Sequence, residues 1–171
     1  MAPNSTSPSP EGITIRRGTA ADLPALGVLG ASLLRTHYAF DPLRFMAPRD
    51  DPESGYAWFL GTQLQEPDVA VFVADRDGKI VGYVYAGLEP QNWKELREEA
   101  GFIHDVVVTP EAQRLGVASA LLDAACKWLH SIGAPRVVLW TAEKNDAAQR
   151  LFSRLGFRRT MIEMTRELDK V

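Results

Sequence analysis

Cysteine is nearly absent from this sequence: Cys126 is the one cysteine in 171 residues. No intrachain disulfide can therefore form, which fits a reducing compartment, and we expect a cytoplasmic protein. Cys126 falls inside an apolar helical pattern, so we interpret it as an inert core thiol rather than a nucleophile.

Several other features are missing, and each argues against a class of function. No apolar run is long enough to span a bilayer, and the first ten residues lack the basic and apolar blocks of a signal peptide. A net charge of -3 gives no electrostatic signature of DNA or RNA binding. His37, His104 and His130 are scattered without partners at metal-ligand spacing, so we predict no metal. The glycine patterns of a P-loop and of a dinucleotide-binding fold are also absent.

The hydrophobic pattern predicts one domain over residues 12–171, preceded by a Pro- and Ser-rich disordered tail at residues 1–11. Strands are predicted at residues 13–17, 69–74, 79–88, 102–108, 137–140, 157–160 and 161–168, with 102–108 and 137–140 buried. Helices are predicted from about 23 to 36, 56 to 65, 115 to 132 and 146 to 155, and residues 92–100 form a short helix or a loop.

This order of elements predicts the fold class α/β (α+β). Strand–helix–strand units in the second half require parallel neighbours, and the hairpins require antiparallel pairs. We therefore expect a mixed, mostly antiparallel sheet of six to seven strands with helices on both faces.

The most informative stretch is QRLGVA at residues 113–118, which stands between a buried strand and a long helix. The first N–H groups of a helix have no partner inside it and lie at the positive end of its dipole. Gly116 permits close backbone approach, and Ala118 and Ser119 keep that approach open. Arg114 can add a charge-assisted contact. The stretch therefore predicts a phosphate-binding turn.

Two motifs in the right order make the chain similar to the GNAT superfamily of N-acetyltransferases. The first is Gln113-Arg114-Leu115-Gly116-Val117-Ala118, which matches the family's acetyl-CoA signature Gln/Arg-x-x-Gly-x-Gly/Ala. The second runs from a strand ending near Asn145 into a helix with Leu-Phe and Leu-Gly-Phe, at residues 151–152 and 155–157. The resemblance covers residues 12–168 and implies a sheet that splays between two central parallel strands.

The resemblance also implies acetyl-CoA as the acyl donor. Its pyrophosphate would lie on the turn and helix start, and its pantetheine arm along the strand that precedes them, paired as an added strand would be. The residues expected to bind it are Val106, Val107, Val108, Gln113, Arg114, Leu115, Gly116, Val117, Ala118, Ser119, Asn145 and Phe152. A plain helix N-cap is the alternative role for Asn145, and core packing is the alternative for Phe152.

His104 and Asp105 are the candidates for the general base. They are polar residues in an otherwise apolar strand, where burial is unfavourable unless they are hydrogen-bonded or functional. Neighbours in a strand face opposite sides, so we expect only one of them to reach the amine. A structural role is the alternative for both, and Glu143 is a weaker candidate.

The family pattern does not supply the group that would protonate the leaving thiolate in this chain. Many members have Tyr where this chain has Phe152, which has no proton to give. Tyr83, Tyr85 or water would take the role. A thiol has a pKa of about 8.5, so the departing thiolate needs little help from a proton donor at neutral pH.

The predicted function is transfer of acetyl from acetyl-CoA to the primary amine of a small molecule. A protein or peptide N-acetyltransferase is the alternative, and a non-catalytic acyl-CoA-binding module is a third hypothesis. The resemblance implies that residues 37–56 and 89–101 hold the acceptor, and their acidic residues would suit a cationic amine or a basic peptide, with solvated loop charges as the alternative: Asp41, Asp50, Asp51, Glu53, Glu89, Glu95, Glu98 and Glu99. Open edge strands also suggest a homodimer.

Overall fold

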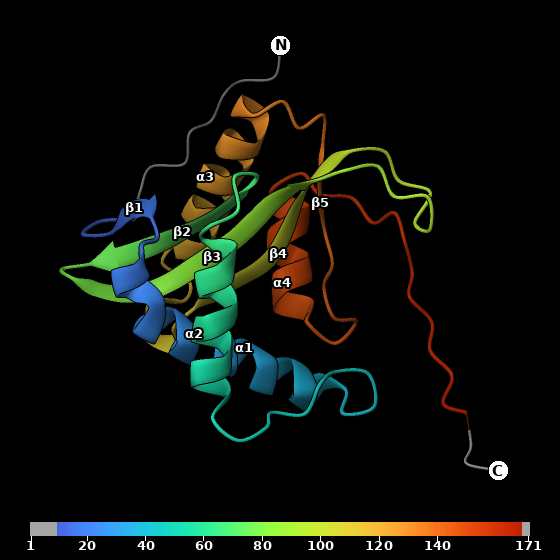
Figure 1. The fold of residues 1–171 in the computed structure, drawn as a ribbon, viewed down its shortest axis with the longest axis horizontal. Coiled ribbons are helices and arrows are strands. Elements are labelled where there is room, and N and C mark those ends of the chain that lie inside the picture. The colour runs from blue at the N-terminus through green and yellow to red at the C-terminus, as the bar shows by residue number, and fades with distance from the viewer. Residues whose placement is uncertain (1–9, 169–171) are drawn as a thin grey trace.

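The computed structural model describes residues 10–168 (Figure 1). The predicted disordered tail therefore lies almost entirely outside the described residues. Within them, no helix is both long enough and apolar enough to cross a membrane.

The centre of the fold is a sheet of five strands in the order β1-β2-β3-β4-β5. The strands are β1 (Thr14–Arg17), β2 (Val69–Arg76), β3 (Lys79–Glu89), β4 (Ala100–Val108) and β5 (Val137–Leu139). The first four pair antiparallel, and β4 and β5 are parallel. The mixed, mostly antiparallel sheet is thus confirmed, although the expected six to seven strands are reduced to five.

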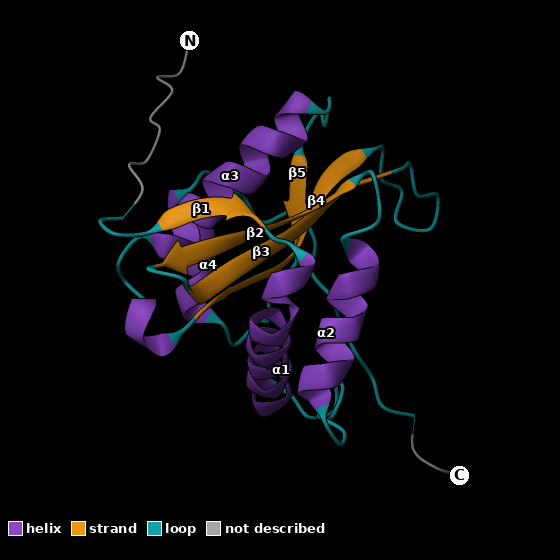
Figure 2. Cartoon of the chain, turned by 60° about the vertical axis from the view of Figure 1, so that its left-hand side comes forward, coloured by secondary structure: helices purple, strands orange, loops and turns teal. Residues whose placement is uncertain are grey.

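Two helices cover each face of the sheet (Figure 2). α1 (Leu23–Phe40) and α2 (Pro52–Gln63) lie side by side on one face, and α3 (Val117–Ser131) and α4 (Asp146–Arg154) lie on the other. Short 3-10 turns, η1 (Ala20–Asp22) and η2 (Pro110–Ala112), precede α1 and α3. We call these the α1/α2 face and the α3/α4 face.

The core has two parts because the sheet is apolar on both sides. On the α1/α2 face, Leu26 and Leu60 of the helices pack against Val71, Val73 and Tyr83 of the strands. The α3/α4 face buries a larger cluster, which includes Val84, Leu121, Leu122, Leu129 and Phe152. Cys126 packs at the margin of this second cluster, and burial raises the pKa of its thiol to about 11, in agreement with an inert core role.

Helix ends differ modestly from prediction. α1 continues to Phe40 rather than to about residue 36. α2 begins four residues before the predicted residue 56, because Asp51 caps it by accepting a hydrogen bond from the Ser54 N–H (3.1 Å) and Pro52 suits the first turn. The turn at Asp77 and Gly78 forms the predicted hairpin, with both residues at positive φ (52° and 83°).

The last part of the chain corrects the prediction. Residues 157–168 form no strand; Phe157 packs against the core, and the rest of the segment runs away from the sheet (Figure 1). Their alternating pattern satisfies the local requirement for a strand, but no neighbouring strand in the described chain pairs with them. β5 also differs, since its residues are only partly buried and Trp140, predicted to be inside, is 67% exposed.

The two parallel strands stay together only briefly. Their pairs are Gly101 with Val137, Phe102 with Val138, and Ile103 with Leu139, after which β5 ends while β4 continues to Val108. The predicted splay therefore begins after Ile103. It lies at the edge of the described sheet rather than at its centre, because residues 157–168 add no strand beyond β5.

Candidate active site

β4 contains one extra residue where it passes Tyr85. Tyr85 pairs with Asp105, and the register then shifts so that His104 has no partner on β3. A bulge of this kind can bring successive side chains to one face. His104 stacks on Tyr85 and Asp105 accepts a hydrogen bond from Tyr83, so both polar residues lie on the α1/α2 face. The premise that the two side chains face opposite sides of the sheet is therefore wrong, and the expectation that only one of them reaches the amine stays a prediction.

The backbone of β4 beyond the bulge offers hydrogen-bonding groups to the splay. Thr109 donates its N–H to the Val81 carbonyl oxygen (2.8 Å), so the backbone of Thr109 faces β3. Because these groups alternate along a strand, Val107 also faces β3, whereas Val106 and Val108 face the side where β5 has ended. This is the arrangement expected of a strand edge that binds an extended ligand.

The predicted phosphate-binding turn joins η2 to α3. Arg114 and Gly116 have positive φ angles (61° and 83°), and Gly116 is the N-cap of α3. Ala120 is the first residue whose N–H bonds back to Gly116 (3.0 Å), so the amides of residues 117–119 have no acceptor inside the helix. No side chain of the described residues caps this end. The turn thus presents unpartnered donors at the positive end of α3.

The side chains of this turn have different environments. Gln113 donates from Nε2 to the Val108 carbonyl oxygen (3.3 Å) and thereby ties the turn to β4. Val117 is buried in the core, whereas Arg114 is exposed and Leu115 is half exposed. Val117 therefore anchors the helix start, and Arg114 remains accessible to an anion.

The two residues of the second motif both have structural roles. Asn145 caps α4 by accepting the Ala148 N–H through its side-chain oxygen (3.2 Å). Phe152 is buried in the core of the α3/α4 face, with its ring 5.9 Å from that of Phe157. These are the alternatives that the sequence left open, and contact of either residue with a coenzyme stays a prediction.

The His104 imidazole is held between rings and a carboxylate. It stacks on Tyr85 (4.6 Å between centroids) and on Phe102 (4.9 Å), and its Nε2 lies 3.1 Å from an oxygen of Glu89. Burial lowers the pKa of His104, although Glu89 and Asp105 oppose this. A neutral ring that donates Nε2–H to Glu89 presents Nδ1 as a proton acceptor.

Asp105 is the centre of a second hydrogen-bond group. Its Oδ2 accepts from the hydroxyls of Tyr83 (2.9 Å) and Tyr56 (3.2 Å). Burial raises the pKa of Asp105, while the two hydroxyls and the nearby His104 and His37 oppose the rise. The contacts found among the described residues use Oδ2, which leaves Oδ1 available to a ligand.

The tyrosines considered as proton donors are already engaged. The Tyr83 hydroxyl donates a hydrogen bond to Asp105, and the Tyr85 hydroxyl donates one to the Gln63 side-chain oxygen (2.8 Å). Burial raises the pKa of Tyr83 well above its usual value and that of Tyr85 to about 12. Both hydroxyls therefore hold their protons firmly at neutral pH.

Most of the acidic residues predicted around the acceptor have partners in the chain. Glu89 and Glu95 both bind Arg97 (2.9 and 2.8 Å), and Glu53 binds Arg35 (2.7 Å). Asp41 and Asp51 accept backbone N–H groups in turns. Glu143 is exposed and lies 3.7 Å from Arg159, which gives no support to its role as a base. The acidic loops are thus mainly structural, apart from Glu89 beside His104.

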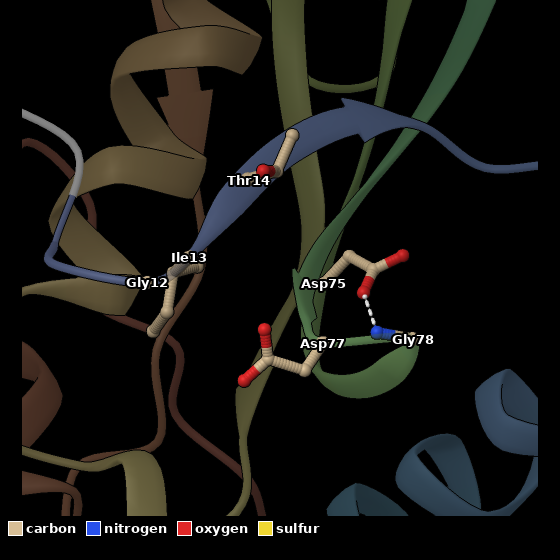
Figure 3. A pocket seen from close by; sticks show the side chains of 6 residues that line it. All are labelled: Gly12, Ile13, Thr14, Asp75, Asp77 and Gly78. Carbon is tan, nitrogen blue, oxygen red and sulfur yellow. Dashed lines mark hydrogen bonds between the residues drawn. The ribbon is translucent and has the colours of Figure 1, made fainter.

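Two surface hollows lie away from His104 and Asp105, and neither is lined by these two residues. The larger, about 520 Å³, is formed by the start of β1 and the β2–β3 hairpin and contains Asp75 and Asp77 (Figure 3). Asp75 already accepts from the Gly78 N–H (2.7 Å) and binds Arg16. The smaller, about 190 Å³, lies in the β3–β4 loop around Trp93. Among residues 10–168, no three His, Cys, Asp or Glu side chains gather as a metal site would require.

Tyr56 and Glu89 both contact the candidate base residues, and neither contact is evident from the sequence. The sequence predicts Glu89 only as a loop charge and Tyr56 only as the start of a helix. The available signal for Tyr56 was the pair Gly27 and Gly30, three residues apart in a helix, which allows another helix to approach closely. Glu89 had no such signal, because its contact with His104 depends on the sheet register.

Comparison with known proteins gives a consistent result. A model of the acetyltransferase (GNAT) family matches residues 33–157. An N-alpha-acetyltransferase of Sulfurisphaera tokodaii is 32% identical over 116 residues, which cover 65% of this chain and 70% of that protein. A mycothiol acetyltransferase of Thermobispora bispora is 31% identical over an alignment of 172 positions, which spans 88% of this chain but only 54% of that protein.

The fold is shared with solved structures. An aminoglycoside N-acetyltransferase, AAC(6')-Iy, in complex with CoA aligns with a TM-score of 0.75 over 95% of this chain and 97% of that chain. The identity is 20%, so this likeness concerns the fold alone.

Proposed function

The chain belongs to the acetyltransferase (GNAT) family, and from this premise we propose that it transfers the acetyl group of acetyl-CoA to the primary amine of a small molecule. The observation that carries the proposal is the end of β4–β5 pairing at Ile103 and Leu139. His104 and Asp105 follow immediately, and the phosphate-binding turn lies at the far end of β4. The candidate base, the open strand edge and the predicted anion site thus follow one another along β4 and the turn after it.

We propose that acetyl-CoA binds along the open edge of β4 and the turn before α3. The backbone groups of Val106 and Val108 would pair with the amides of its pantetheine arm, as an added strand does. The N–H groups of residues 117–119 and the Arg114 side chain would bind its phosphates. When bound, the coenzyme supplies an activated acetyl group and a thiolate leaving group.

The residues of the site would then handle the proton of the amine. The amine nitrogen bonds to the acetyl carbon, the carbon–sulfur bond breaks, and one amine proton passes to His104 Nδ1 or to Asp105. The N–H of Val106 would donate to the carbonyl oxygen as charge develops on it. Because Tyr83 and Tyr85 are engaged elsewhere, we infer that water protonates the thiolate.

Two other functions remain testable alternatives. A protein or peptide N-acetyltransferase is favoured by similarity to the N-alpha-acetyltransferase of Sulfurisphaera tokodaii. A non-catalytic acyl-CoA-binding module is favoured only by the absence of the usual Tyr at Phe152. The cytoplasm stays our proposed location, on the basis of the single cysteine.

The direct test is an acceptor screen that measures free CoA thiol. Purified protein with acetyl-CoA is offered small amines, polyamines and short peptides with free N-termini. We expect a small amine to accelerate thiol release, and either His104→Gln or Asp105→Asn, whichever removes the base, to lower kcat/KM by about a hundredfold, a usual effect of losing a general base. Acetyl-CoA binding without acceleration by any amine would support the binding module instead, and acceleration by peptides alone would support the peptide enzyme.

We also propose that the protein forms a homodimer through residues 157–168. Met161, Ile162, Met164 and Leu168 of this segment are 75–90% exposed, and the outer edge of β5 has no neighbour among the described strands. An extended apolar segment and an open strand edge are complementary, and exchange between two identical chains would satisfy both. Within the chain, Arg44 already binds Glu163 of the segment, with 2.9 Å between Arg44 Nη2 and Glu163 Oε2.

A further inference from the structure

A row of aromatic rings crosses the α1/α2 face of the sheet. Phe59 of α2 meets Tyr85 edge-on (5.9 Å), Tyr85 stacks on His104 (4.6 Å), and His104 stacks on Phe102 (4.9 Å). Trp140 then meets Phe102 edge-on at 5.2 Å. The rings come from one helix, two strands and the residue that follows β5, and we call them the aromatic row.

The exposed end of the row stands at the splay. Ile103 and Leu139 are the last paired residues of β4 and β5, so His104 and Trp140 are the next residues on either side of the opening. The core cluster of the α1/α2 face, which includes Leu26, Leu60 and Tyr83, covers the β2–β3 part of the sheet. Phe102 and Trp140 do not belong to this cluster. Trp140 is 67% exposed and the His104 side chain 29% exposed, so a ligand at the splay can touch both rings.

The charges beside the row suit an ammonium group. Asp105 follows His104 and keeps Oδ1 available, while Glu89 borders the other side of His104. Arg97 already satisfies Glu89 and lies over the Phe102 ring (5.7 Å), so the row holds a cation at one place. Faces of aromatic rings attract cations, and carboxylates add to that attraction. The free carboxylate oxygen is therefore on the Asp105 side.

We propose that the acceptor is an amine attached to an aromatic group, whose ring packs against Trp140 and His104 while its nitrogen faces Asp105. The inference rests on the proposed acetyl transfer and specifies its substrate class. Aromatic pairs gain from edge and stacked geometry beyond the area they bury, so an aromatic amine should outcompete a saturated amine of equal size. Trp140 is then a specificity-determining residue, and it lies outside the base and the coenzyme site.

The test compares 2-phenylethylamine with 2-cyclohexylethylamine, which have similar size and charge. We expect kcat/KM to favour the aromatic amine by about twofold to tenfold, the range that one ring–ring contact supplies. Trp140→Ala should remove this preference, and Trp140→Phe should keep most of it. Trp58→Ala is the matched control, because Trp58 is equally exposed (73%) on α2 and outside the row. This control should leave the preference unchanged.

A binding measurement separates this inference from the proposed reaction. Equilibrium binding of both amines to the CoA-bound protein should show the same preference and the same loss in Trp140→Ala, even if no amine is acetylated. Absence of acetylation with preserved aromatic preference would overturn the reaction alone. Equal binding of the two amines, or a Trp140→Ala variant that changes only the oligomeric state, would overturn the inference.

Discussion

Asp22 is a buried carboxylate with three kinds of hydrogen-bond donor. It is 7% exposed and accepts bonds from Arg16 (2.8 and 2.9 Å), from the Thr19 N–H and from the Thr19 hydroxyl. The Arg16 bond is the main reason that the pKa of Asp22 falls from 3.8 to about 2, since burial alone would raise it. The group thus ties β1 to the turn that precedes α1.

This carboxylate should make stability depend on acid. The folded-state pKa is below the unfolded value, so its contribution is present above pH 4 and is lost as the pH falls toward 2. At about 1.4 kcal/mol per pH unit, the contribution at pH 7 is about 2 kcal/mol. Urea unfolding should show Asp22→Asn less stable by this amount at pH 7, with the difference shrinking near pH 2. Asp50→Asn, in an exposed loop, should match the wild type, and an equal loss at both pH values would contradict the assignment.

His104 should set the acid limb of activity. Burial lowers the pKa of its imidazole below 6.5, so more than half of the rings are still neutral at pH 6.5 and the midpoint of protonation lies at lower pH. The acid limb of the kcat/KM profile should therefore have its midpoint below pH 6.5. Glu89→Gln removes an anion that raises this pKa, so the limb should move to still lower pH. An unchanged limb in His104→Gln would assign the titration to another group, with Asp105 the first candidate.

α1 and α2 approach each other closely because glycines line their contact. A Cβ at Gly30 would overlap the Tyr56 ring, and one at Gly27 would overlap the Glu53 carbonyl oxygen. Small residues at this contact let Tyr56 reach across the helix pair and donate to Asp105. The close packing of α1 and α2 thus decides whether Asp105 receives its second hydroxyl hydrogen bond, the one from Tyr56.

We expect Gly30→Ala to destabilise the protein by about 1–3 kcal/mol, the usual cost of overpacking. It should also lower activity through the displaced Tyr56, and Tyr56→Phe should reproduce the loss of activity without the loss of stability. Gly55→Ala is the matched control on α2, where an added Cβ meets nothing within 4 Å. Thermal unfolding should find that control more stable by about 0.5–1 kcal/mol, as expected in a helix interior. A Gly30→Ala protein with wild-type stability would refute the packing argument.

The two ends of α3 offer a second matched pair. Gly116 and Gly133 both have positive φ (83° and 92°), so alanine at either position should cost about 1–2 kcal/mol of stability. Gly116→Ala should in addition weaken acetyl-CoA binding about tenfold or more, because the change shifts amides that bind phosphate and each charge-assisted bond is worth about 1.5–3 kcal/mol. Titration calorimetry should find the Gly133→Ala affinity unchanged. Equal acetyl-CoA affinities for the wild type and both variants would show that the phosphates bind elsewhere.

Local signals predicted most of these elements well. The start of α3 at Val117 and its end before Gly133 follow from glycine and small residues, which act within one turn. The hairpin at Asp77 and Gly78 follows from backbone preference alone. The bulge at His104 could not be predicted, because it is a mismatch between β4 and β3 that neither strand contains by itself. The hydrogen bonds of Asp105 were missed for the same reason.

The largest failure concerned the size of the sheet. Residues 157–168 have the alternation of a strand, and the prediction of two strands there was wrong for the described chain. Alternation shows that a segment can pair, and it says nothing about which edge it pairs with. Among the described residues, the outer edge of β5 has no partner strand, and the apolar side chains of residues 161–168 are exposed.

Light scattering after size-exclusion chromatography should therefore find a dimer. Ile162→Glu places a charge in the exchanged segment and should yield monomers, whereas Arg166→Glu, on a polar position of the same segment, should remain dimeric. The reason is that burial of apolar surface drives the contact, and a charged group cannot be buried there without a partner. A wild-type protein that stays monomeric at high concentration would contradict the proposal.

The extra residue of β4 also limits how the chain can change in length. Substitutions in β4 alter one side chain at a time, but loss of one residue between Ala100 and His104 would let β3 and β4 pair without interruption. His104 and Asp105 would then alternate, and one of them would turn into the apolar cluster around Val84 and Leu121. We expect homologous enzymes that keep both polar residues to vary freely in loop length while holding the number of residues in this strand constant.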